Sequence, residues 1–281
     1  MMILTAAIAV ALAAVALASS PAAALGLGDV ISDFLYYRES LAADRAWPSP
    51  KGTLFLDAVY TREDQRFDDF GSATASSYGG QIGVLYAPFD RVLVHGTFRG
   101  FGSDVKFSFD DDTEEKFHRR FVETRLGADL IYLDTKPLKA WLTLEGGFTN
   151  SDTDVSNAFW SWRAAASTTL SWRIGNVLLE PMVGVVFADS FDRDTERVTL
   201  VGAGFAAKYR GERWRPQLNF AYSKVVDPNI HDDGFIEVGP EVLYAVTPSL
   251  LVGLGYTYGT PIDRDIHFDS HTAMLRIRWT F

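Results

Sequence analysis

The chain ends in the segment HTAMLRIRWTF, from His271 to Phe281, whose residues alternate strictly between two kinds of side chain. One set is apolar and comprises Ala273, Leu275, Ile277, Trp279 and Phe281, and the other is mostly polar and comprises Thr272, Met274, Arg276, Arg278 and Thr280. Successive side chains of a β-strand point to opposite faces, so the segment predicts a strand with one oily and one charged face. Termini usually fray in solvent, so an aromatic last residue inside such a strand restricts the folds that fit.

The composition of the 281 residues excludes several classes of protein. Cysteine is absent, which rules out disulfide frameworks, thiol nucleophiles and cysteine-ligated zinc. The formal net charge of -10 argues against nucleic-acid binding, which needs a basic face. Twenty Phe, eleven Tyr and seven Trp are many aromatic residues for a protein surface in water to hide.

The N-terminal residues predict an export signal. Ile3 to Ala18 is an unbroken apolar run, and small-residue cleavage patterns end at Ala18 and Ala24, so we expect a signal peptide over residues 1–24, with a signal anchor as the alternative. No later segment approaches the roughly 18 apolar residues of a membrane helix, so any crossing must use strands.

Residues 25–50 predict a short amphipathic helix. Its apolar positions recur at helical spacing, and they are Val30, Ile31, Phe34, Leu35 and Leu41. Trp47, Pro48 and Pro50 end it.

From Lys51 onward the hydrophobic period is two, and the pattern predicts an all-β chain with twelve strands. We expect them at 53–61, 76–86, 92–101, 119–132, 139–148, 159–173, 177–187, 198–209, 214–223, 235–244, 250–259 and 271–281. Even-numbered strands are followed by tight turns, at 87–90, 133–137, 175–176, 211–212 and 246–249. Odd-numbered strands are followed by long acidic loops. Short turns on one side and long loops on the other are typical of a transmembrane antiparallel up-and-down β-barrel.

The face that carries Phe281 has aromatic residues near both ends of the strands, as expected where rings sit at a membrane interface. One predicted girdle comprises Tyr86, Tyr132, Trp172, Tyr209, Tyr244, Trp279 and Phe281. The other comprises Tyr60, Phe98, Phe148, Phe187, Tyr222 and Tyr258. Aliphatic residues lie between the two.

The opposite face is charged, and we expect it to line a lumen. Its candidate selectivity residues are Asp57, Arg99, Glu123, Arg125, Asp129, Glu145, Arg163, Glu180, Arg215, Glu237, Glu241, Arg276 and Arg278. A soluble β-barrel such as a lipocalin would place the oily face inside, which is the opposite assignment.

In these features the chain resembles Gram-negative outer-membrane β-barrels, whose last strand closes the barrel and commonly ends in Phe. Over residues 27 to 281 it is similar to the translocator domain of autotransporters, with twelve strands, a helix ahead of the first strand and a terminal Phe. About 25 residues separate the predicted signal from the barrel at 51–281, so the resemblance is to a solitary barrel without a passenger. It implies an outer-membrane location, assembly by the barrel-assembly machinery through the last strand, a monomer or small homo-oligomer, and a helix that plugs the lumen or lies in the periplasm.

The inward charges leave two functions open. They are nearly balanced, and neighbours such as Glu237 and Glu241 beside Arg215, or Asp57 beside Arg276, are expected to pair. A narrow porin-like channel for small solutes is the first hypothesis, and a non-conducting structural or surface-interaction barrel held rigid by ion pairs is the alternative. Arginine-rich channels for acidic oligosaccharides are similar in size, but here carboxylates match the arginines.

The loops predict acidic clusters that could hold Ca²⁺ or Mg²⁺, and we expect them to face lipopolysaccharide and other outer-membrane lipids. The candidate ligands are Asp110, Asp111, Asp112, Asp152, Asp154, Asp192, Asp194, Asp232, Asp233, Asp263 and Asp265. No loop matches a complete calcium motif, and solvated loops that attract cations are the simpler interpretation, with no resident cofactor.

A lipid hydrolase is a remote alternative. Asp269 and His271 share one face of the last strand beside Ser270, so the carboxylate could orient the imidazole as in a catalytic triad. No matching nucleophile segment occurs elsewhere, and we expect a protein that is not an enzyme.

Overall fold

The computed structural model describes residues 51–67, 71–109, 113–154, 156–190, 198–226, 234–262 and 267–281. The predicted signal peptide over 1–24 and the predicted helix within 25–50 lie outside these residues. No helix in the described part of the chain is long and apolar enough to cross a membrane.

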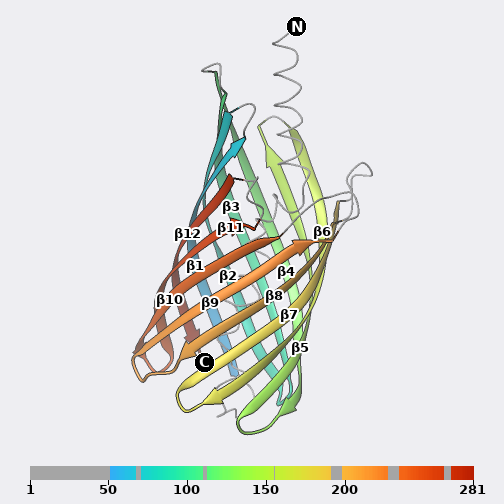
Figure 1. Cartoon of the computed structure of the whole chain (residues 1–281). Coiled ribbons are helices and arrows are strands. Elements are labelled where there is room, and N and C mark those ends of the chain that lie inside the picture. Colours follow the sequence, from blue (N-terminus) through green and yellow to red (C-terminus); the bar gives the residue numbers. More distant parts are fainter. Residues whose placement is uncertain are drawn as a thin grey trace.

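The described residues form one closed antiparallel barrel of twelve strands, as the alternation predicts. Each strand pairs with its neighbours in sequence, and β1 pairs with β12 (Figure 1). The strands are β1 Lys51–Phe67, β2 Gly71–Phe89, β3 Val92–Phe109, β4 Glu114–Asp134, β5 Leu138–Thr153, β6 Ser156–Ile174, β7 Val177–Ser190, β8 Val198–Tyr209, β9 Trp214–Val225, β10 Phe235–Thr247, β11 Leu250–Pro261 and β12 His267–Thr280.

The end of the chain closes the barrel. The Gly52 amide donates to the Phe281 carbonyl at 3.1 Å, and the Phe281 amide donates to the Gly52 carbonyl at 2.9 Å. The aromatic ring of Phe281 lies over Gly52, where a Cβ atom would collide with it. Phe281 therefore contributes both its backbone and its ring to the seam between the first and last strands.

The turns at the end of the barrel that holds Phe281 are short, as predicted. Each joins an even-numbered strand to the next, and Figure 1 shows these hairpins together at the lower end beside the C-terminus. Gly175 adopts a φ of 60° in the turn between β6 and β7, a left-handed conformation in which a Cβ atom is disfavoured.

The strands on one side of the barrel are longer than predicted. Strands β1–β6 have 16–21 residues and β7–β12 have 12–14, and the longer set rises above the shorter one in Figure 1. Glu114 and Asp152, which we expected in loops, lie in β4 and β5. Beyond the apolar band both faces of a strand can carry polar residues, so the alternation that marks a strand disappears although the hydrogen-bonded ladder continues.

The seam provides a test of the closure. Gly52→Val should displace the Phe281 ring and lower the free energy of unfolding by about 1–3 kcal/mol, the usual cost of overpacking. Gly100→Ala is the matched control, because the nearest atom to a Cβ there is 3.9 Å away. The measurement is the urea midpoint for loss of the compact, heat-modifiable band on gels. Equal midpoints for the two variants would show that the ring does not support the seam.

Candidate functional site: a charged belt inside the barrel

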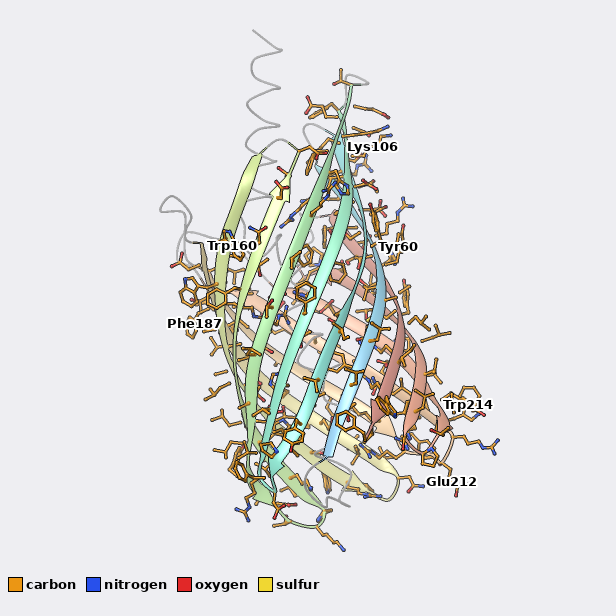
Figure 2. All side chains as sticks on the ribbon, turned by 180° about the vertical axis from the view of Figure 1, so that it is seen from behind. Tyr60, Lys106, Trp160, Phe187, Glu212 and Trp214 are labelled. Atoms are coloured by element: carbon orange, nitrogen blue, oxygen red, sulfur yellow. The ribbon has the colours of Figure 1, made fainter. Side chains whose placement is uncertain are left out.

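The outer face of the barrel is apolar over its middle and aromatic toward both ends. Leu126 and Leu254 in the middle are 68% and 67% exposed. The residues of both predicted girdles lie on this face and are half-exposed or exposed. Figure 2 shows Tyr60, Trp160 and Phe187 around the upper part of the barrel and Trp214 near the opposite end. Trp160 and Trp214 extend the rings that we predicted.

The predicted lumen residues all lie on the inward face. Nearly all are buried, and only Glu145 and Arg215 are half-buried. Charged side chains are therefore inside and large apolar side chains outside, which is the reverse of a protein that folds in water.

On the β3–β6 side of the barrel, these charged side chains surround a single carboxylate. Glu123, which is fully buried, accepts a charge-assisted hydrogen bond from the Nε of Arg99 and one from Arg125 at 2.8 Å. Arg163 lies 3.7 Å from the other carboxylate oxygen of Glu123 and reaches Glu145 at 3.0 Å. A buried charge is costly unless it is paired, and here three guanidinium groups surround one carboxylate.

A second group of these side chains lies on both sides of the seam between β12 and β1. Arg276 lies 3.1 Å from Glu241 and 4.0 Å from Asp57, so the expected pair of Asp57 and Arg276 is present. Gln217 donates to Glu241 at 2.7 Å. Glu241 thus binds Arg276 and Gln217, although we had expected Arg215 beside it. Gly255 of the intervening strand lies next to this pair, and a Cβ there would be in ordinary van der Waals contact with Glu241 at 3.6 Å.

Gln81 connects these two groups. Its amide donates to Asp57 at 2.6 Å, and it pairs in register with Arg99 on the neighbouring strand. We call this continuous band of side chains the central belt, and it consists of Asp57, Gln81, Arg99, Glu123, Arg125, Glu145, Arg163, Gln217, Glu241 and Arg276. It runs from β9 through β12 and β1 to β6. At its β9 end, Gln217 pairs in register with Lys208 of β8.

The remaining predicted lumen residues lie outside the belt. Lys208 binds Glu180 at 2.8 Å, and Thr143 donates to Asp129 at 2.5 Å. The guanidinium of Arg278 lies 5.3 Å from the centre of the Phe55 ring.

The interior also contains apolar side chains that we did not predict. Below the belt a buried cluster comprises Phe55, Leu85, Ala87, Leu93, Ile131 and Trp141. The rings of Phe101 in β3 and Phe121 in β4 stack with their centroids 4.9 Å apart, next to Arg99. On β6–β9 an apolar wall comprises Ala165, Met182, Val186, Ala188, Val198, Leu200, Ala206, Ala221 and Val225. The parity that places Asp57 inside also places Phe55 inside, so the signal was present in the sequence.

The remote hydrolase site does not assemble as a triad. The Tyr256 hydroxyl is 2.6 Å from Nδ1 of His271, while the Tyr258 hydroxyl donates to Asp269 at 2.6 Å. Ser270 lies on the opposite face of the strand. These polar groups therefore interact with tyrosines of the outer face.

Among the candidate metal ligands only Asp152 and Asp154 lie in the described part of the chain. Asp154 accepts a hydrogen bond from the His118 amide at 3.0 Å, and Asp152 is exposed. No group of three metal-binding side chains forms among the described residues. Asp110, Asp111, Asp112, Asp192, Asp194, Asp232, Asp233, Asp263 and Asp265 lie outside them, so divalent binding stays a prediction.

Ion pairs cover the outer surface of the long strands beyond the aromatic ring. Arg62 binds Asp64 at 3.0 Å, and its hydrogen bond holds the pKa of that carboxyl below its usual value. Lys106 binds Glu114 at 2.5 Å and lowers the pKa of that carboxyl in the same way. We call these residues, Arg62, Asp64, Lys106 and Glu114, the charged rim, and it carries both positive and negative charges at neutral pH.

No family model matches the sequence, and a search of curated proteins finds no relative. Solved structures are similar in fold. The translocator domain of the autotransporter NalP from Neisseria meningitidis has a TM-score of 0.63 at 8% identity, over 94% of this chain and 98% of that one. The transport unit of AIDA-I from Escherichia coli has a TM-score of 0.58 at 12% identity, over 90% and 98%. An outer-membrane channel from Pseudomonas putida F1 has a TM-score of 0.58 at 12% identity, over 86% and 99%. The chain thus has the twelve-stranded barrel fold of autotransporter translocator domains, which it shares with this channel.

The belt predicts a large effect of a small substitution. Glu123→Gln keeps the shape of the side chain but leaves three buried guanidinium groups without their common anion, so the free energy of unfolding should fall by about 3–5 kcal/mol. Glu114→Gln, an exposed pair on the rim, is the control and should leave the urea midpoint unchanged. A midpoint for Glu123→Gln equal to that of the control would mean that the belt does not stabilise the barrel.

Proposed function

We propose that this protein is an integral outer-membrane β-barrel of a Gram-negative bacterium and acts as a narrow channel for small solutes. The observation that carries the proposal is the inverted distribution of side chains, with an exposed apolar band outside and charged side chains inside. Only a bilayer makes that band favourable, because hydrocarbon replaces water around it. The fold shared with an outer-membrane channel supports the same assignment.

The central belt is the proposed selectivity region. Charged side chains around a lumen set which ions pass, and Glu241 and Arg276 place both signs of charge at one level. The belt side chains interact mainly with one another, so we infer a narrow path that passes small ions and solutes. We also propose that the channel has no enzymatic activity, since Asp269 and His271 are held by tyrosines.

The second candidate is a non-conducting barrel that serves as a structural or surface-interaction element. The burial of the belt favours it, because Glu123 is 0% exposed and Arg276 is 1% exposed. In this case the belt would act as a rigid seal. The charged rim around Arg62 and Lys106 would then carry the function, through contacts with lipopolysaccharide and divalent cations.

Single-channel recording in planar bilayers separates the two candidates. Small, steady conductance is expected for a channel. Glu241→Gln should shift the reversal potential toward anion selectivity and Arg276→Gln toward cation selectivity, because each removes one charge from the belt. Glu212→Gln, at a turn outside the belt, is the control and should change neither value. Silence from a barrel that remains heat-modifiable would reject the channel and leave the non-conducting barrel.

A further inference from the structure

The wall of the barrel is interrupted between β10 and β11. Within the described strands, pairing runs from Phe235 opposite Pro261 to Val238 opposite Tyr258 and resumes at Glu241 opposite Gly255. Gly239 and Pro240, which would face Thr257 and Tyr256, are skipped. Pairing of the same two residues with β9 is continuous, as is pairing of β11 with β12. The interruption therefore belongs to one seam.

Proline explains the interruption. Pro240 has no N–H to donate to the ladder, so a backbone carbonyl of the facing strand loses its partner. In the apolar band, where Val238 and Val242 flank Pro240 on the outer face, no water replaces that donor. The seam is therefore weaker here than along the rest of the barrel.

The seam between β6 and β7 also contains a proline, Pro181, and differs from the β10–β11 seam in one respect. Pairing between β6 and β7 skips Glu180 and Pro181 in the same way. There the inward side is bridged, because the Ser171 hydroxyl donates to Glu180 at 3.0 Å. At the β10–β11 seam the inward residue of β10 is Gly239, which has no side chain with which to form a bridge.

Asn219 lies on the inward face of β9, one strand away from the weak seam. It pairs in register with Gly239, is 2% exposed, and neither atom of its amide has a hydrogen-bond partner among the described residues. A buried amide without partners is costly, so its presence points to a ligand that supplies them. The apolar wall on β6–β9 begins beside it, since Ala206 pairs with Asn219 and Ala221 follows in the same strand.

We propose that the β10–β11 seam is a lateral port through which a neutral single-chain lipid passes from the bilayer into the barrel. Its acyl chain lies along the apolar wall, and its hydroxyl or amide head binds the Asn219 amide, which both donates and accepts. The inward carboxylate of Glu237 lies two residues from Gly239 on the same face and disfavours an anionic head, whereas Glu241 on the other side is paired with Arg276. This inference rests on the proposed location in a bilayer, and it concerns a route and a ligand class that the belt alone does not provide.

Photolabelling of the full chain in phosphatidylcholine liposomes tests the port. The probe is a monoacylglycerol with a diazirine on its acyl chain, and mass spectrometry locates the labelled residues. Inward positions next to Asn219, such as Ala206 and Ala221, should be labelled in the native protein. Pro240→Val restores the missing N–H and should reduce inward labelling at least fivefold, while labelling of the outward Leu218 stays constant. Pro181→Val, at the bridged seam, should have no effect.

A reversible closure provides the second measurement. The chain has no cysteine, so Val242→Cys with Leu254→Cys places one pair across the seam on the outer face, next to Pro240, and leaves the proline in place. Oxidation should abolish inward labelling and reduction should restore it. The same probe with an ionised carboxylate head should label the inward positions several-fold less.

Inward labelling that is absent in the native barrel, or that survives both Pro240→Val and the oxidised cysteine pair, would overturn the port. Equal inward labelling by the ionised probe would overturn the neutral head. Failure of the proposed channel would appear separately, as silence in planar bilayers from the same heat-modifiable preparation.

Discussion

The whole structure depends on the pairing of β1 with β12. An antiparallel sheet of this length would otherwise expose two edges, and unpaired backbone groups cannot lie in hydrocarbon. The mutual hydrogen bonds of Gly52 and Phe281 begin a ladder that continues to Arg66 opposite His267. Once the sheet is closed, its two faces become an outside and an inside, and every other feature of the molecule follows from which residues fall on each.

Closure places charges where water is scarce, and the interior satisfies them by pairing. Glu123 is stabilised by three arginines, and Arg276 by two carboxylates on either side of it. Apolar clusters lie below the belt and along β6–β9, so the interior is layered and not uniformly polar. This layering favours a narrow path, because side chains and not water fill most of the cross-section near the belt.

The two sides of the barrel differ in length and in continuity. Strands β1–β6 are long and carry the ion pairs of the outer rim, as in Arg62 with Asp64. Strands β7–β12 are shorter, and prolines interrupt two of the seams that they form. The long side is suited to contacts beyond the membrane surface, whereas the short side contains the seam interrupted at Pro240 and most of the apolar wall.

The sequence by itself determined the faces. Side chains alternate with a period of two, and taking Phe281 as outward places Arg276 inside and Ile277 outside. The same alternation along the rest of the chain predicted twelve strands, both aromatic girdles and every charged residue of the belt. It also contained the inward position of Phe55, since the parity that places Asp57 inside applies to every second residue of the strand, whether charged or apolar. Tertiary structure alone decided the partners: Glu241 binds Arg276 because closure and register bring β10 and β12 together across the glycines of β11. It also decided the strand ends, since beyond the apolar band both faces meet water and alternation no longer distinguishes a strand from a loop.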